Sequence, residues 1–505
     1  MYKAELIINK DFRNAEVSPL IYGSFVEHMG RVVYNGIYEP GHPKSDENGF
    51  REDVIQKVKE MGVTCIRYPG GNFVSCYDWR DGVGKKEERP RRRELAWKSI
   101  ETNQFGTDEF MQWAKKADIT PIFAVNLGTK GVENAVSLLE YCNLPAGTSY
   151  SDWRLENGSE EPYGIPIWCL GNEMDGTWQI GHKTPEDYGK LAVQAAHAMK
   201  ALDSSIKTVV CGSSSTDVPT YTDWERIVLE YTYDFADYIS LHQYYGGQEM
   251  GTEEFLAQSV DMEEYIQTVI GICDMVKSKK KSNKKIDICF DEWGVWEISG
   301  EEVADSVSSR EWQVAPAFSE QIYTMEDALL FAGMLMAMVK KCDRVKVACQ
   351  SLLTNISAAI MTENGAEVWV QPIFYPFSYM SRYGKGILME SILKSPCYLS
   401  KKGKEIPYLD QVVIYNEKES ELVLYLVNRK GEPAVVETVL QGFCTDTVAE
   451  HTSLFHADIK ADNKSDHEKV KPHFAMIEET EKKKVSCKLE PYSWNMIRIK
   501  VNRNE

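Results

Sequence analysis

The sequence predicts an α/β fold: a (β/α)8 TIM barrel followed by a C-terminal antiparallel β-sandwich domain. Two observations predict it. Over the first 385 residues, eight short apolar runs alternate with longer segments of helical spacing, and beyond them the pattern changes to strict period-two alternation. Runs that are apolar almost throughout are typical of parallel strands covered on both faces by helices.

The eight predicted barrel strands share one feature, which is that each ends in polar or aromatic residues. They are residues 21–27, 65–71, 121–126, 165–173, 208–214, 238–244, 286–293 and 344–350. A doubly wound open sheet is the alternative, but a barrel gives nearly every strand end a reason to be polar, because all eight ends face one site. The intervening segments, such as TDEFMQWAKKAD at 107–118, have the spacing of amphipathic helices.

From residue 386 onward the chain alternates between apolar and polar residues, as in QVVIYN (411–416) and ELVLYLVNR (421–429). This alternation is typical of an antiparallel β-sandwich. We therefore expect a barrel that carries the active site at 16–385 and a sandwich at 386–505. A further strand-like segment, AELIIN, precedes the barrel, and we expect residues 1–15 to join the sandwich.

An excess of acidic residues, 76 Asp and Glu against 57 Lys and Arg for a net charge of −19, argues against a general binder of nucleic acid or anionic membranes. The longest apolar run, at 328–339, is too short to span a membrane and predicts a buried helix. The start, MYKAELIINKDF, lacks the features of a secretory signal, so we expect a cytoplasmic protein. The 12 cysteines are scattered, without C-x-x-C pairs or clustering with His, so we expect reduced thiols, no metal and no organic cofactor.

Two carboxylates stand out among the polar residues at the predicted strand ends. Glu173 ends the fourth strand in WCLGNEMDG and Glu292 ends the seventh in CFDEWGVW, so a closed barrel would place them opposite each other. A single Glu at a strand end is more often a cap or an ion-pair partner. Two opposed carboxylates among Trp and Tyr residues instead indicate glycoside hydrolysis, in which one protonates the leaving oxygen and the other attacks or activates water.

Several long segments of the sequence are, taken together, much more diagnostic than any single short motif. They include IYGSFVEHMGR (21–31), RYPGGNFVSCYDWRDGVG (67–84), WCLGNEMDGTWQIGHKT (168–184), DYISLHQYYG (237–246) and FDEWGVW (290–296). In this order they resemble glycoside hydrolase family 51, the α-L-arabinofuranosidases, and the resemblance covers nearly the whole chain.

The resemblance implies that Glu173 is the acid/base and Glu292 the nucleophile. It also implies that Asn172 hydrogen-bonds the sugar 2-hydroxyl and that Tyr244 orients the nucleophile. The other substrate-binding residues that it implies are Glu27, Arg67, Asn72, Trp97, His242 and Trp296. From the residues alone, His242 is also compatible with a core histidine and Trp97 with a loop anchor.

The two carboxyl groups need opposite protonation states for this chemistry. Glu173 must hold a proton near neutral pH, so its surroundings should raise its pKa, while Arg67 and hydrogen bonds should keep Glu292 ionised. We expect carboxyl groups about 5–5.5 Å apart and retention of the anomeric configuration.

Some positions depart from the family pattern. Leu352 stands where members commonly have Gln, and Gln350 lies two residues earlier on the same strand face, where it is a candidate to contact the sugar instead. Val370 and Pro372 replace a basic residue and Thr, and Thr177 replaces Pro. These differences bear on substrate preference.

The leading hypothesis is therefore a retaining exo-α-L-arabinofuranosidase that acts on arabino-oligosaccharides or arabinoxylan fragments. Within enzymes, β-xylosidase or endoglucanase activity at the same site is the alternative. A carbohydrate-binding protein without catalysis is the alternative from another class, although a binder has no need of two opposed carboxylates. The resemblance also implies a homo-oligomer, with a hexamer as one candidate.

Overall fold

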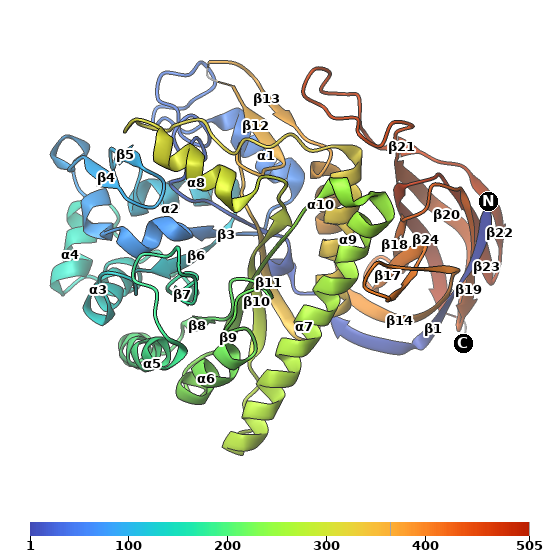
Figure 1. Cartoon of the computed structure of the whole chain (residues 1–505), viewed down its shortest axis with the longest axis horizontal. Helices are drawn as coiled ribbons and strands as arrows, with labels where there is room; N and C mark the ends of the chain where they lie inside the picture. The colour runs from blue at the N-terminus through green and yellow to red at the C-terminus, as the bar shows by residue number, and fades with distance from the viewer. Residues whose placement is uncertain (364, 504–505) are drawn as a thin grey trace.

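Eight parallel strands close into a barrel in the computed structural model, which describes residues 1–363 and 365–503 (Figure 1). In chain order the strands are β2 (Gly23–Phe25), β3 (Cys65–Tyr68), β6 (Thr120–Val125), β7 (Ile167–Leu170), β8 (Lys207–Cys211), β9 (Tyr238–Tyr245), β10 (Asp287–Val295) and β11 (Val345–Gln350). Each of them overlaps one of the eight predicted runs. The predicted barrel is confirmed.

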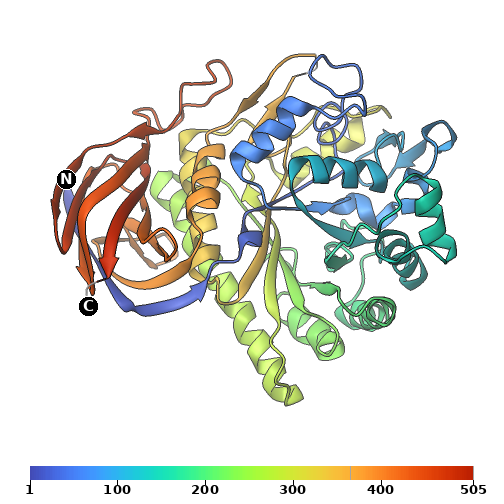
Figure 2. The same cartoon turned by 180° about the vertical axis from the view of Figure 1, so that it is seen from behind.

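Helices surround the barrel strands, and they run from blue through green and yellow to orange in Figures 1 and 2. They are α1 (Glu52–Met61), α2 (Thr107–Ala117), α3 (Val132–Asn143), α4 (Ser149–Glu156), α5 (Pro185–Leu202), α6 (Asp223–Thr232), α7 (Thr252–Lys280), α8 (Gly300–Ser309), α9 (Met325–Lys340) and α10 (Phe374–Tyr383). Local sequence sets their ends. The side chain of Thr184, for example, accepts a hydrogen bond from the backbone of Asp187, and Pro185 begins α5.

Helix α9 contains the long apolar run and is buried on all sides. It packs against α7 and β11 of the barrel and also against β17 (Leu409–Asn416), β18 (Glu421–Asn428) and β24 (Ser493–Arg503). An all-apolar helix needs apolar partners around its whole circumference. Its position between the barrel and the second domain supplies them.

The second domain is built on one ten-stranded sheet with the order β21-β20-β24-β18-β17-β14-β1-β19-β23-β22. Its other strands are β1 (Tyr2–Glu16), β14 (Ile387–Lys394), β19 (Ala434–Gln441), β20 (Phe443–Leu454), β21 (His473–Phe474), β22 (Ile477–Glu481) and β23 (Lys484–Leu489). The sheet curls until β20, next to one edge, contacts β22, the strand at the opposite edge, and an apolar core with Leu6, Leu424 and Leu489 fills the space between its halves. The predicted sandwich is therefore made from a single curled sheet.

The first strand of the chain lies in the middle of this sheet. β1 pairs antiparallel with β14 and parallel with β19, which is an exception to the predicted antiparallel order. The domain limits at residues 15/16 and 385/386 stay a prediction.

Short two-stranded hairpins lie in the loops of the barrel and of the second domain. They are β4 (Arg92–Glu94) with β5 (Ser99–Glu101), β12 (Ile360–Thr362) with β13 (Val368–Val370), and β15 (Cys397–Leu399) with β16 (Glu405–Pro407). Across the residues that the structure describes, no helix combines the length and the apolar character needed to cross a membrane.

Candidate active site

A cavity of about 690 Å³ opens at the carboxyl ends of the barrel strands. Its polar side chains follow or end the strands β2, β3, β7, β9, β10 and β11, and they include Glu27, Asn72, Glu173, Tyr244, Glu292 and Ser351. Its apolar wall includes Trp97, Trp178, Trp296 and Leu352, together with Val303 and Val307 of α8. The cavity thus combines a polar floor with an apolar mouth.

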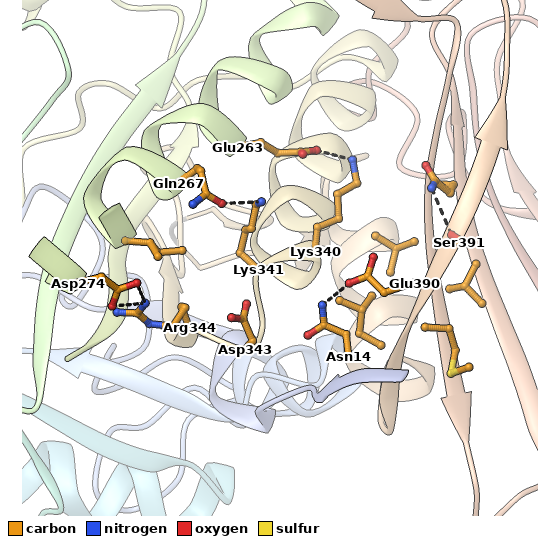
Figure 3. Close-up of a pocket in the computed structure, with 16 residues that line it drawn as sticks. Asn14, Glu263, Gln267, Asp274, Lys340, Lys341, Asp343, Arg344, Glu390 and Ser391 are labelled. Carbon is orange, nitrogen blue, oxygen red and sulfur yellow. Dashed lines mark hydrogen bonds and ion pairs between the residues drawn. The ribbon is translucent and has the colours of Figure 1, made fainter. Parts of the chain in front are cut away.

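A second cavity, of about 470 Å³, lies between α7, the end of α9 and strands β14 and β17 (Figure 3). Several of its charged groups pair with one another: Lys340 contacts Glu263, and the Arg344 guanidinium donates to Asp274. Lys340 also donates to Asp410 of the second domain, so this cavity lies at the contact between the domains, and it shares no lining residue with the cavity at the strand ends. We therefore take the cavity at the strand ends as the candidate active site.

Glu292 is held from two sides by hydrogen-bond donors. Arg67 Nη1 donates to its Oε1 over 2.6 Å, and the Tyr244 hydroxyl donates to its Oε2 over 2.9 Å. The same hydroxyl lies 2.8 Å from Ser351 Oγ. Donors on both oxygens stabilise the ionised carboxylate and fix its direction.

Glu173 follows β7 and accepts hydrogen bonds at both carboxylate oxygens. His242 Nδ1 lies 3.0 Å from its Oε1, and Trp178 Nε1 donates to its Oε2 over 2.8 Å. Burial raises the pKa of Glu173 above its ordinary value, the two donors oppose this rise, and the charge of Glu292 adds to it. The raised pKa is the direction that a general acid requires.

His242 and Arg67 are the two cations beneath the carboxylates. Burial lowers the pKa of His242, but Glu292, Asp291 and Glu173 outweigh it and raise that pKa to about 10. Burial also lowers the pKa of Arg67, and the charges of Asp291 and Glu292 more than compensate. Both side chains are therefore positively charged at neutral pH.

The opposite wall of the cavity positions further polar atoms. The Oε1 atom of Glu27 accepts 2.8 Å hydrogen bonds from Trp97 Nε1 and from the backbone of Phe73. The side chain of Asn172 accepts from Arg67 Nη2 over 2.6 Å and donates to Asn72 Oδ1 over 3.2 Å. These contacts pre-organise carboxylate and amide groups that are suited to sugar hydroxyls.

An oxygen of Glu173 lies within 4.8 Å of an oxygen of Glu292, and His242 offers a nitrogen within the same distance. In the part of the chain that the structure describes, this is the one group of three side chains spaced for a metal ion. Two neighbouring cations, Arg67 and protonated His242, disfavour a metal there, and we assign none. The short separation suits a nucleophile and an acid/base on either side of one glycosidic bond.

Most of the predicted site residues meet at this cavity. Glu27, Asn72, Trp97, Glu173, Tyr244, Glu292 and Trp296 line it, while Arg67, Asn172 and His242 lie behind the carboxylates and contact them or Asn72. Gln350 does not line it: the side chain is buried and its Nε2 donates to the carbonyl of Ser357. The strand ends at Gln350, so the alternation of strand faces does not continue to Ser351 and Leu352, which both line the cavity.

Comparison with known proteins identifies the family. Residues 57–261 match the family described as "Alpha-L-arabinofuranosidase 1 domain", and residues 291–493 match "Alpha-L-arabinofuranosidase C-terminal domain". An intracellular exo-α-(1→5)-L-arabinofuranosidase from Acetivibrio thermocellus is 49% identical over 99% of this chain and 100% of its own length. One from Bacillus subtilis is 48% identical over 99% of each chain. A solved structure of a family 51 α-L-arabinofuranosidase from Bifidobacterium longum superposes with a TM-score of 0.94 at 39% identity, covering 99% of this chain and 100% of that one.

The chain belongs to glycoside hydrolase family 51.

The positions at which this chain differs from the family 51 sequence pattern lie in different parts of the structure. Leu352 lines the cavity, and Thr177 is exposed beside Trp178 at its mouth. Val370 and Pro372 do not line the cavity, and the backbone of Val370 instead accepts a hydrogen bond from Asn463 of the second domain. Leu352 is therefore the one of these departures that lines the cavity, and Thr177 is next to the lining residue Trp178.

Sequence reasoning missed several residues of the site. Trp178 lies in the segment at 168–184 that resembles the family, so the sequence does contain a signal for it. Asp291 directly precedes Glu292, but strand alternation would turn it away from the interior. The apolar face of α8 is visible only as helical spacing in GEEVADSVSS (300–309), and nothing in that pattern shows that it faces the cavity.

Proposed function

We propose that this chain is a retaining exo-α-L-arabinofuranosidase that releases terminal α-L-arabinofuranosyl residues from arabino-oligosaccharides or arabinoxylan fragments. The observation that carries the proposal is the pair of carboxylates, Glu173 and Glu292, whose oxygens lie within 4.8 Å of each other in the cavity at the barrel strand ends. The names of the two curated relatives support α-(1→5)-linked substrates. No observation favours β-xylosidase or endoglucanase activity.

In the first step, the carboxylate of Glu292 attacks the anomeric carbon while the bond to the leaving oxygen breaks. Glu173 gives its proton to that oxygen. In the second step, the ionised Glu173 takes a proton from water, the water oxygen attacks the anomeric carbon, and Glu292 leaves as a carboxylate. Arabinose is released with its original anomeric configuration.

The supporting residues have roles that follow from their contacts. Arg67 and Tyr244 donate hydrogen bonds to Glu292 and hold it in line, and His242 and Trp178 orient Glu173. Glu27, Asn72 and Asn172 offer polar atoms to the arabinose hydroxyls, and Trp97 and Trp296 form walls of the pocket. A direct contact of Gln350 with the sugar has no support, because Gln350 does not line the cavity.

A homo-oligomer, with a hexamer as one candidate, and a cytoplasmic location belong to the same proposal. The word "intracellular" in the names of both curated relatives supports the location. Gel filtration with light scattering measures the assembly directly. A monomer at micromolar concentration would contradict the oligomer.

The activity is tested with 4-nitrophenyl α-L-arabinofuranoside, 4-nitrophenyl β-D-xylopyranoside and a cello-oligosaccharide. We expect turnover of the first to exceed the others by orders of magnitude, with retained configuration in the first product by NMR. Glu292→Ala should lower kcat by about 10⁴-fold or more, because no other group can form the glycosyl-enzyme. Preferred turnover of a xyloside or glucan, an inverted product, or an active Glu292→Ala variant would each contradict the proposal.

The acid/base assignment needs its own variant. Glu173→Ala should be much less impaired on an aryl arabinofuranoside with a good leaving group than on an arabino-oligosaccharide, since only the second needs a proton on the leaving oxygen. Added azide should restore turnover of the aryl substrate, because an anion can then replace the water that Glu173 would have deprotonated. Equal losses on both substrates without azide rescue would argue against the assignment.

A further inference from the structure

Asp291 is a completely buried carboxylate that does not line the active-site cavity. Its Oδ2 lies 3.0 Å from Arg67 Nε, and its Oδ1 lies 3.4 Å from His242 Nε2. The Ser240 hydroxyl donates to Oδ1, and the thiol of Cys169 lies 3.7 Å from Oδ2. Asp291 therefore contacts both cations of the site and none of the space that a substrate can occupy.

The charges of this cluster can be counted. Three carboxyl groups, Glu173, Asp291 and Glu292, surround two cations, Arg67 and His242. Before reaction the cluster is neutral if Glu173 holds a proton and carries one excess negative charge if it does not. Once Glu292 is esterified to the sugar it has no charge, and the cluster is then neutral only if Glu173 is ionised. In a buried site an unbalanced charge is costly, so the neutral arrangement is favoured in each state.

We propose that Asp291 is a positioning residue that sets the number of protons on the Glu173–His242 pair, so that Glu173 is protonated before the glycosyl-enzyme forms and ionised afterwards. This inference rests on the proposed function, because it assigns no role to Asp291 outside that reaction. Asp291 acts through His242 and Arg67 and does not contact the reacting atoms.

The other ionisable groups around the cluster behave differently from Asp291. Burial raises the pKa of Asp291, but Arg67 and His242 outweigh it and lower that pKa to about 2. Burial raises the pKa of Glu27, Asp175 and Tyr244, which face the same cluster from the β2, β7 and β9 ends, and of the thiols Cys169, Cys211 and Cys289 beneath it. Asp291 thus supplies a negative charge at neutral pH and well below it.

The test is the pH dependence of kcat/KM for the full-length enzyme, measured on an aryl arabinofuranoside with a poor leaving group. The alkaline limb of this profile reports loss of a proton from the Glu173–His242 pair in the free enzyme. Asp291→Asn removes one negative charge at nearly constant shape, so the pair should lose that proton more easily. We expect the alkaline limb to move to lower pH by about one to two units, with a tenfold loss of kcat/KM per unit at pH values above the limb.

Two further variants separate charge from structure. Asp291→Glu keeps the charge, so its alkaline limb should stay within about 0.3 unit of the wild-type position even if the displaced carboxylate lowers kcat. Asp287→Asn makes the same chemical change at the start of β10, next to Lys285 and Arg344, and should leave the profile unchanged. If Asp291→Asn does not fold, Asp291→Ser removes the charge and is expected to give the same shift.

An alkaline limb that does not move in a folded, uncharged variant of Asp291 would overturn the inference. So would an equal shift in Asp291→Glu or in Asp287→Asn. A wild-type enzyme that does not hydrolyse arabinofuranosides would overturn the proposed function as well, and the two failures are therefore distinguishable.

Discussion

Glu173 stands on left-handed backbone, with a φ of 44°. A residue other than glycine in this region costs on the order of 1–2 kcal/mol, because its Cβ crowds the neighbouring carbonyl. Here the conformation places the carboxyl group against both His242 and Trp178. The strained backbone therefore occurs at Glu173, and the proposed proton transfer depends on the direction of the Glu173 carboxyl group.

A prediction at the residue scale concerns Glu27. Burial raises the pKa of Glu27 to about 8, even though Phe73 and Trp97 donate hydrogen bonds to it. Its folded-state pKa lies above the unfolded value of about 4.3, so the stability it contributes is present below pH 4.3 and is lost as the pH rises towards 8. The melting temperature of Glu27→Gln should therefore rise relative to wild type between pH 5 and pH 8, by about 1 °C per kcal/mol in a chain of this length.

Thermal unfolding at several pH values measures this difference. Glu16→Gln, at an exposed carboxyl group, is the matched control and should show a difference that does not depend on pH. A pH-independent difference for Glu27→Gln would contradict the prediction.

The sequence predicted Glu173 and Glu292 because polar ends of buried strands point to one site in any closed barrel. It could not predict the part played by Asp291. Neighbouring residues of a strand face opposite sides, yet a register shift between Cys289 and Glu292 allows both Asp291 and Glu292 to contact the interior residue Arg67. The same limit applies to the expected sugar contact of Gln350. The alternation of strand faces holds only within a strand, and β11 ends at Gln350.

At the scale of elements, α8 has an unusual position for a helix: none of its residues is buried, but one face lines the active-site cavity. That face carries Val303, Ala304 and Val307, whereas Glu301 and Asp305 do not line the cavity. A sequence pattern can predict such a helix but not what its apolar face covers. The structure places that face in the wall of the active-site cavity.

The prediction for α8 follows from this placement. Val303→Asp should raise KM for an aryl arabinofuranoside by about tenfold, since it puts a charge into the apolar part of the cavity wall. The melting temperature should change little because the residue is not part of the core. Asp305→Ala is the control on the same helix, and an equal rise of KM in both variants would contradict a specific role for the apolar face.

At the scale of the whole molecule, a buried ion network joins the barrel to the second domain. Asp410 of β17 accepts from Lys340 of α9 over 2.6 Å and from Arg429 over 2.5 Å, and Arg429 also donates to Ser259 of α7 over 2.9 Å. Burial raises the pKa of Asp410, but Arg429 and Lys340 outweigh it and lower that pKa below its ordinary value. The network lies away from the active-site cavity and serves the contact between domains.

Removing the centre of this network should destabilise the protein without changing its chemistry. Asp410→Ala removes the ion-pair partner of the buried Arg429 and leaves Lys340 with Glu263 alone, and we expect a loss of about 3–5 kcal/mol in the free energy of unfolding. Because the folded-state pKa of Asp410 is lowered, the loss should be full above about pH 4 and should shrink as the pH falls further. Denaturant unfolding measures it, with kcat/KM as the check on chemistry.

The control for this prediction is Glu60→Ala, which removes a half-exposed ion pair with Lys57 and should cost less than about 1 kcal/mol. A similar small loss for Asp410→Ala would show that the network does not hold the domains together. A large loss of kcat/KM at full folding would show that it acts on the active site.

The central position of β1 also determines the order in which the chain can fold during synthesis. Asn9 of β1 and its partner Gln441 of β19 are 432 residues apart in the chain. At about 5–20 residues per second, the ribosome needs roughly 20–90 s to make the second after the first. The barrel strands are all complete before then, so the earliest strand to emerge is among the last to be paired, and its apolar side chains depend on other protection in the interval.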